Sequence, residues 1–192
     1  MKFYPVDTKV YQIVYEDRSV SVETIPLQHR MPTCGYLIRE KATQPHIRRE
    51  MIDFYQIPTS QINNIKAGAE WMTPDGERIP NDRLVRPADA LRSYAYCSDT
   101  RYIPTLHEQL KGVSTLYHES TYGEDKLQSA EKYCHSTARQ AAMVARDAGV
   151  GKLLLGHYSS RYDNEEMLKA EAEAIFPNVI LAQEGLVVEV GT

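Results

Sequence analysis

Carboxylate and imidazole side chains follow three apolar, strand-like segments in the second half of the chain. SYAYCSDT ends in Asp99, STLYHEST carries His118 and Glu119, and KLLLGHYSSRY continues into His157. In layered α/β folds, residues just past the strand ends gather at one rim of the sheet. A carboxylate and two imidazoles at such a rim predict a metal-binding or acid–base cluster.

His135 has a different setting, directly before Ser136-Thr137 and the alanine-rich segment TARQAAMVARDA. That segment predicts a helix capped by Ser136 or Thr137. A histidine beside a helix N-terminus lies where an anionic phosphate is favoured. An exposed or locally hydrogen-bonded histidine explains the same spacing equally well.

His29 follows the strand-like segment ETIPLQ and precedes Arg30-Met31-Pro32. A single histidine at a strand end is more often structural than a metal ligand, and the same holds for His118 taken alone. The residues alone therefore leave both histidines open.

The elements that would position these residues are an N-terminal hairpin and a later alternation of strands and helices. We expect strands at 10–15, 20–27 and 35–39. Residues 41–91 differ, with short helices at 47–55 and 61–66 and a turn at Thr73-Pro74-Asp75-Gly76. From residue 92 we expect strands at 94–98, 115–118, 152–157, 179–182 and 186–190, and helices at 104–111, 124–133, 137–148 and 165–176. The pattern predicts an α/β fold with helices packed on the sheet.

Composition places few limits on function. The chain has 192 residues, of which 42% are hydrophobic and 25% charged, as in an average soluble domain. Three widely spaced cysteines (Cys34, Cys97 and Cys134) indicate reduced thiols and a cytoplasmic protein. We see no signal peptide and no membrane span.

The formal net charge of −4 argues mildly against nucleic-acid binding, because such proteins usually carry a basic excess. Basic residues are nevertheless concentrated in the middle third of the chain. They form either a solvated surface or one that contacts phosphates: Arg48, Arg49, Lys66, Arg78, Arg83, Arg86 and Arg92.

Taken together, the motifs resemble ribonuclease Z, the endonuclease that trims the 3′ trailer from precursor tRNA. The matching segments are QHRMPTCGYLI, YCSDTRY, HEST, the HST around His135, GHYSSRY and IFPNVILAQEGL, and they occur in family order. The resemblance implies an α/β fold that is the C-terminal half of a metallo-β-lactamase αββα sandwich. It also implies a cytoplasmic metal-dependent endoribonuclease that acts on precursor tRNA.

The resemblance assigns a role to each candidate residue. Asp99 matches the aspartate that bridges two zinc ions, His29 a ligand of the first zinc, and His157 a ligand of the second. His135 matches the histidine that contacts the scissile phosphate and aids departure of the leaving oxygen. Glu119 lies near that site in the family and would orient a histidine or a metal ligand. Zinc is implied by the family, and manganese would also suit oxygen and imidazole ligands.

The chain departs from the family pattern because it contains no His-x-His-x-Asp-His motif. That motif supplies two ligands to each zinc, and a catalytic zinc normally has three protein ligands and a water. We therefore expect this chain alone to be inactive. Without the family's first sheet, apolar strand faces would be exposed. We expect either a homodimer or pairing with the missing N-terminal half.

Residues 41–91 lie in the position of the family's tRNA-binding arm, as a helical and irregular insertion in a single incomplete domain. They contain no Gly-Pro pairs, which such arms often carry. Two alternatives to the enzyme part stay open. One is a non-catalytic half-fold that acts as a binding or assembly module, and the other is a different phosphodiesterase of the same superfamily.

Overall fold

The computed structural model describes residues 2–191 and divides the chain into two compact units. The first unit contains the residues up to Glu40 together with those from Arg92 onward. The second contains Lys41–Leu91.

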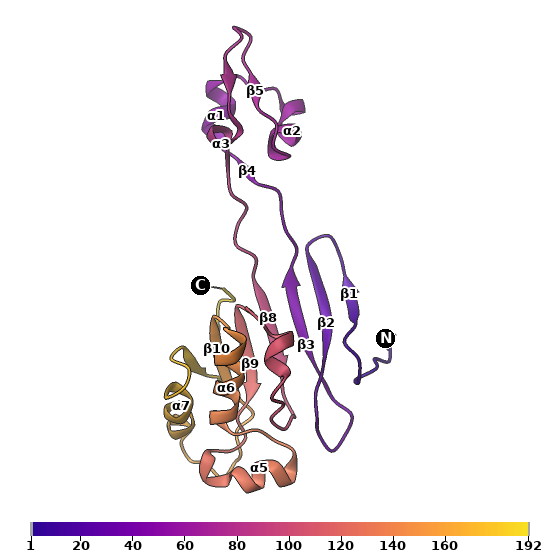
Figure 1. Cartoon of the computed structure of the whole chain (residues 1–192), viewed down its shortest axis with the longest axis vertical. Helices are drawn as coiled ribbons and strands as arrows, with labels where there is room; N and C mark the ends of the chain where they lie inside the picture. Colours follow the sequence, from indigo (N-terminus) through magenta and orange to yellow (C-terminus); the bar gives the residue numbers. More distant parts are fainter. Residues whose placement is uncertain (1, 192) are drawn as a thin grey trace. The chain divides into compact units, whose positions relative to one another are not determined.

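The first unit is built on a seven-stranded sheet in the order β1-β2-β3-β8-β9-β10-β11 (Figure 1). β1, β2, β3 and β8 pair antiparallel, and β8 to β11 pair parallel. β2 therefore runs in the same direction as the four later strands, and their carboxyl ends share one rim. The strands are β1 (Ile13–Glu16), β2 (Val20–Pro26), β3 (Cys34–Glu40), β8 (Ser93–Cys97), β9 (Thr115–Glu119), β10 (Lys152–Gly156) and β11 (Val179–Leu181).

Four helices accompany this sheet: α4 (Leu106–Gln109), α5 (Leu127–Tyr133), α6 (Ala138–Ala148) and α7 (Glu166–Glu173). α6 packs on β9 and β10, and α7 packs on α6 and β11. The buried face of α6 is mostly alanine, which permits close approach to the sheet. Thr137 caps this helix in a capping box with Gln140, and Gly149 ends it with a left-handed backbone.

The core lies between the sheet and these helices. The sheet contributes to this core a row of residues that pair across neighbouring strands: Leu37, Ala95, Leu116, Leu153 and Val179. All five side chains are buried, and they belong to a single hydrophobic cluster with the inward residues of α6 and α7. The alternation of side chains along each strand sends the intervening residues to the opposite face of the sheet.

That opposite face carries a second paired row, Tyr36–Tyr96–Tyr117–Leu154–Ile180, here called the tyrosine face. The rings of Tyr96 and Tyr117 stack with centroids 4.7 Å apart, and Tyr96 is 42% exposed. Gly156 makes room for Tyr117, because a Cβ there would lie 2.2 Å from the Tyr117 hydroxyl. The C-terminal segment covers this face over β8 to β10, whereas Tyr36, Ile38 and Tyr96 are each more than a third exposed.

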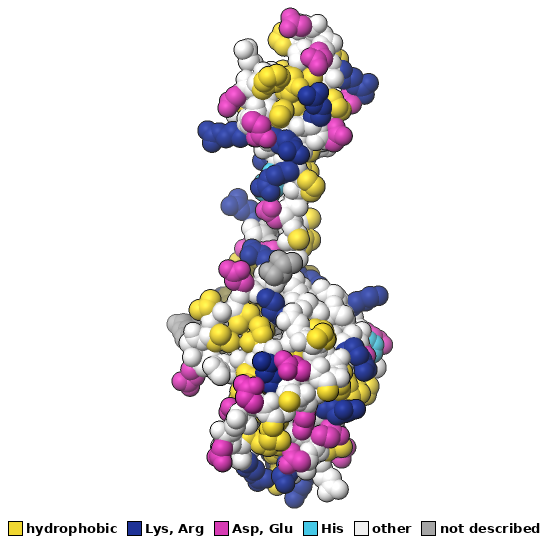
Figure 2. Space-filling model, turned by 90° about the vertical axis from the view of Figure 1, so that its left-hand side faces the viewer, with side chains coloured by type: hydrophobic (Ala, Val, Ile, Leu, Met, Phe, Trp, Pro, Cys, Tyr) yellow, Lys and Arg dark blue, Asp and Glu magenta, His cyan; other side chains and the backbone are white. Residues whose placement is uncertain are grey.

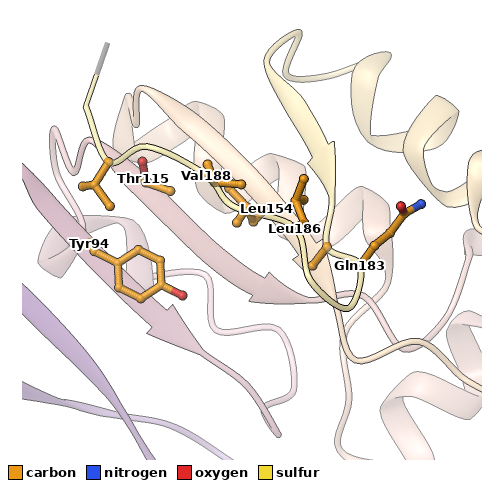
Figure 3. A pocket seen from close by; sticks show the side chains of 8 residues that line it. Tyr94, Thr115, Leu154, Gln183, Leu186 and Val188 are labelled. Carbon is orange, nitrogen blue, oxygen red and sulfur yellow. The ribbon is translucent and has the colours of Figure 1, made fainter.

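The predicted strand at residues 186–190 is wrong. These residues form no strand and instead cross the tyrosine face (Figure 3). Leu186, Val188 and Val190 line a pocket of about 300 Å³ with Tyr94, Thr115 and Leu154. The alternation of apolar residues predicted a strand. Here it arises because every second side chain packs on the sheet, although the segment pairs with no strand.

The second unit has a small core of its own, made by Tyr55, Ile57, Ile65, Ile79 and Leu84. The turn predicted at Thr73–Gly76 joins β5 to β6, with the Gly76 amide donating to the Thr73 carbonyl. Basic and acidic side chains both occur on the face that Figure 2 shows. Its elements are β4 (His46–Ile47), α1 (Arg49–Phe54), a 3-10 turn (Thr59–Gln61), α2 (Ile62–Lys66), β5 (Trp71–Met72), β6 (Arg78–Ile79), α3 (Asn81–Leu84) and β7 (Val85–Arg86).

The other predicted strands and helices are present, with shorter or shifted ends. The helix expected at 104–111 forms only over Leu106–Gln109, and that at 124–133 begins as a 3-10 turn over Glu124–Lys126. No helix within residues 2–191 is long and apolar enough to cross a membrane.

Candidate metal and acid–base site

Asp99 and His157 emerge from the shared rim on tight loops. Asp99 comes two residues after β8 and His157 directly after β10. Both have a left-handed backbone, with φ values of 55° and 57°. Such a conformation costs of order 1 kcal/mol for a non-glycine residue, and strained residues of this kind cluster at active sites and ligand-binding sites. His157 Nε2 lies 3.3 Å from Asp99 Oδ1.

His29 reaches the same rim from the loop that follows β2. The Gln28 carbonyl accepts a hydrogen bond from the Arg101 amide (2.8 Å), and the Gln28 amide donates to the Thr100 hydroxyl (3.2 Å). These bonds hold the His29 loop against the loop that carries Asp99. His29 Nδ1 lies 2.9 Å from the carbonyl oxygen of Cys134. A carbonyl only accepts, so Nδ1 carries the hydrogen and Nε2 is left free.

His135 pairs with the fully buried carboxylate of Glu119. Its Nδ1 lies 3.0 Å and 3.1 Å from the two Glu119 oxygens. The same carboxylate accepts from the amides of Thr100 (2.6 Å) and Ser136 (3.0 Å). Glu119 has no exposed surface, and all the partners of its carboxylate are hydrogen-bond donors. We therefore interpret Glu119 as an ionised residue that organises the loops at the rim.

The pKa shifts of this pair follow from those contacts. Burial opposes ionisation of Glu119, but hydrogen bonds from His135, Thr121 and Ser136 outweigh it and lower the pKa of the carboxyl. The hydrogen bond to Glu119 raises the pKa of His135, against desolvation. Both directions favour an ion pair of carboxylate and imidazolium.

His157 is oriented by Thr121, whose hydroxyl lies 2.8 Å from His157 Nδ1. The hydroxyl also lies 2.6 Å from a Glu119 oxygen and 3.0 Å from the His157 carbonyl. Thr121 is 7% exposed. One buried side chain therefore contacts both the Glu119–His135 pair and His157.

The structure brings all five predicted site residues together. One ligand atom from each of His29, Asp99 and His135 lies within 4.8 Å of the others, and the same holds for Glu119, His135 and His157. The centroids of His135 and His29 are 4.9 Å apart, and those of His135 and His157 are 5.4 Å apart. Each Nδ1 has a protein partner, as in metal sites where the second ring nitrogen is held by the protein.

The donor set that fits a divalent metal is His29, Asp99 and His135, and His157 adjoins it through its contact with Asp99. His157 Nε2 and Asp99 Oδ1 are 3.3 Å apart, and because the carboxylate only accepts, a proton or a cation belongs between the two atoms. Glu119 is a poorer ligand, since its oxygens already accept from Thr100, Thr121, His135 and Ser136. We therefore interpret the group around Glu119 as a hydrogen-bond network.

Two open points from the sequence are resolved by the geometry. His118 is fully buried on the helix side of β9, with Nδ1 2.8 Å from the Glu119 carbonyl, so it is a structural residue. Thr137 caps α6, whereas the Ser136 hydroxyl donates to the Thr100 carbonyl. Thr121 was given no role from the sequence, although its place in HEST, two residues after Glu119, was a usable signal.

Curated relatives confirm the resemblance over nearly the whole chain, although no family model matches it. The chain is 53% identical over 184 residues to ribonuclease Z of Bacteroides fragilis strain YCH46, covering 96% of this chain and 60% of that protein. It is 51% identical over 186 residues to ribonuclease Z of Parabacteroides distasonis, covering 97% of this chain and 61% of the relative. The chain thus spans about 60% of the length of these relatives.

Solved structures confirm the metallo-β-lactamase fold. A metallo-β-lactamase fold protein from Bacillus subtilis aligns over 93% of this chain and 52% of its own length, with a TM-score of 0.59 and 18% identity. The short form of human tRNase Z aligns over 95% and 48%, with a TM-score of 0.53 and 17% identity. The chain is therefore similar to ribonuclease Z in sequence and has about half of the fold of these structures.

Proposed function

We propose that this chain is part of a metal-dependent endoribonuclease that removes the 3′ trailer from precursor tRNA by phosphodiester hydrolysis. One observation carries the proposal. His29, Asp99, Glu119, His135 and His157 converge at one rim, and each histidine has its Nδ1 held by a protein group. The similarity to ribonuclease Z supports this substrate class.

In this proposal the zinc ions would be held by His29, Asp99 and His157. When bound, a pair of metal ions would activate a water and stabilise the charge of an in-line transition state. The Cys134 carbonyl and the Thr121 hydroxyl orient the two histidines so that Nε2 faces the site. The four ligands of the absent His-x-His-x-Asp-His motif would have to come from outside this sequence.

His135 serves as the acid on the leaving-group side. The hydrogen bond to Glu119 raises the pKa of His135, which favours the imidazolium, and Glu119 holds the proton on Nδ1. The second proton, on Nε2, is then available to the leaving oxygen of the scissile phosphodiester. Glu119 itself is buried and acts by orienting and charging His135.

The partner of the tyrosine face is proposed to be the remaining part of the ribonuclease Z fold or a second copy of this chain. Tyr36, Tyr96 and Ile38 are each more than a third exposed there. Exposed apolar patches of this kind favour association. The free thiols of Cys34, Cys97 and Cys134 support a reducing, cytoplasmic compartment.

Residues 41–91 are proposed to take the place of the family's tRNA-binding arm. Their own small core makes them a folded unit. Arg48, Arg49 and Arg83 are exposed and suit contacts with phosphates, which position RNA without reading its sequence.

The test is cleavage of a precursor tRNA with zinc present. This chain is assayed alone and together with the part of the Bacteroides fragilis relative that it does not match. We expect cleavage only from the combination, and its loss in Asp99→Ala. A combination that is correctly assembled but leaves the RNA intact would contradict the proposed function.

A further inference from the structure

We infer that Thr121 is a positioning residue that fixes the His157 tautomer and couples it to the Glu119–His135 pair. The inference rests on the proposed function of the same rim, and it assigns a role to a side chain that touches neither RNA nor metal. It starts from the hydrogen-bond capacity of one buried hydroxyl.

A threonine hydroxyl has one hydrogen to donate and two lone pairs to accept with. Two groups near Thr121 Oγ1 can only accept: a Glu119 oxygen at 2.6 Å and the His157 carbonyl at 3.0 Å. They compete for the single hydrogen. The carboxylate is closer and ionised, and hydrogen bonds to charged acceptors are the stronger ones. The hydroxyl therefore donates to Glu119.

Its lone pairs then face the ring of His157, whose Nδ1 lies 2.8 Å away. Because the hydrogen of the hydroxyl is committed to Glu119, Nδ1 must supply the hydrogen of this contact. His157 is thereby held as the Nδ1–H tautomer. Its Nε2 is left to the proposed metal, 3.3 Å from Asp99 Oδ1; without a metal, that carboxylate competes for a hydrogen on Nε2.

The backbone around Thr121 fixes this arrangement. The Ser120 amide donates to the Gly156 carbonyl at 2.8 Å, and the Ser159 amide donates to the Thr121 carbonyl at 3.2 Å. These bonds join the ends of β9 and β10 on both sides of His157. The hydroxyl is thus placed by main-chain bonds, and a change in the side chain alone removes its effect on His157.

The experiment compares Thr121→Val, which removes the hydroxyl at similar volume, with Thr121→Ser, which keeps it. For the spectra, both changes are made in an Asp99→Ala background, which removes the acceptor opposite Nε2. Long-range proton–nitrogen spectra of the metal-free chain report the protonated nitrogen of each ring, at a pH about two units above the usual histidine pKa of about 6.5. The His157 signals are assigned with His157→Ala. We expect the Nδ1–H tautomer in the background chain and in Thr121→Ser, and a shift toward Nε2–H in Thr121→Val.

A second measurement is zinc affinity of the chain combined with the remainder of the fold. Losing a group that orients a metal-bound histidine typically costs about 10- to 100-fold in affinity. We expect a loss of that size in Thr121→Val and recovery in Thr121→Ser. An unchanged His157 tautomer in Thr121→Val would overturn the inference. The spectra need no RNA. A failure of cleavage would therefore contradict the proposed function without deciding the role of Thr121.

Discussion

Glu119 and His135 form a buried hydrogen-bonded pair, with Nδ1 3.0 Å from one carboxylate oxygen and 3.1 Å from the other. The contact is the largest cause of the raised pKa of His135. We therefore predict that Glu119→Gln lowers the His135 pKa, measured by titrating its ring signals in the metal-free chain. Glu131→Gln, an exposed change on α5, is the control and should leave that pKa in place. An unchanged value in Glu119→Gln would show that the pair does not set the charge of His135.

The same pair predicts how stability depends on pH. The Glu119 pKa is lowered, so its contribution is present above the unfolded value of about 4.3 and is lost as pH falls through the folded pKa. The His135 pKa is raised, so its contribution is present below about 6.5 and is lost as pH rises through the folded pKa. The stability lost in Glu119→Gln, measured by urea unfolding, should be greatest between about pH 4.5 and 6.5. A loss that is constant from acid to neutral pH would contradict an ionised pair.

The sequence pointed to Asp99, His157 and the neighbours His118 and Glu119 at strand ends, and its resemblance to ribonuclease Z added His29 and His135. It could not reveal what holds their rings. The partner of His29 is a main-chain carbonyl, that of Cys134, whose backbone has φ 60°. Such a contact depends on the path of a loop and leaves no trace in residue types.

The sequence also could not show which of His118 and Glu119 belongs to the site and which is a structural residue. They are neighbours at the end of β9, and only the register decides which faces the helices. In the same way, residues 186–190 alternate as a strand would, yet they cover the face of the sheet. Alternating apolar residues indicate only that every second side chain is buried. A strand within a sheet and an unpaired segment that packs across a sheet both give this pattern.

The capping box at the start of α6 predicts a measurable loss of stability. Thr137 accepts from the Gln140 amide at 3.1 Å, and the Gln140 side chain accepts from the Thr137 amide at 3.0 Å. Thr137→Ala should lower the free energy of unfolding by about 1 kcal/mol, the usual cost of losing such a cap. Thr137→Ser keeps the hydroxyl and should recover most of it. Equal losses in both variants would point to packing of the methyl group as the cause.

The tyrosine face predicts that the chain associates in solution. Light scattering over a range of concentrations should show a mass above that of a monomer when the chain is alone. Tyr96→Lys, which places a charge at a 42% exposed position on that face, should shift the equilibrium toward monomer. Tyr4→Lys, at a 71% exposed position before the first strand, is the control. A monodisperse wild-type monomer at high concentration would count against association through this face.

Zinc binding tests the central claim most directly, because it asks whether the converging side chains form a metal site. Calorimetric titration is carried out on the chain combined with the remainder of the ribonuclease Z fold, using wild type, Asp99→Ala and His107→Ala. His107 contacts the Pro104 carbonyl and lies outside both ligand groups found in residues 2–191. We predict that the wild type and His107→Ala bind zinc alike and that Asp99→Ala loses binding. Equal stoichiometry and affinity in Asp99→Ala would contradict the assignment of this rim as the metal site.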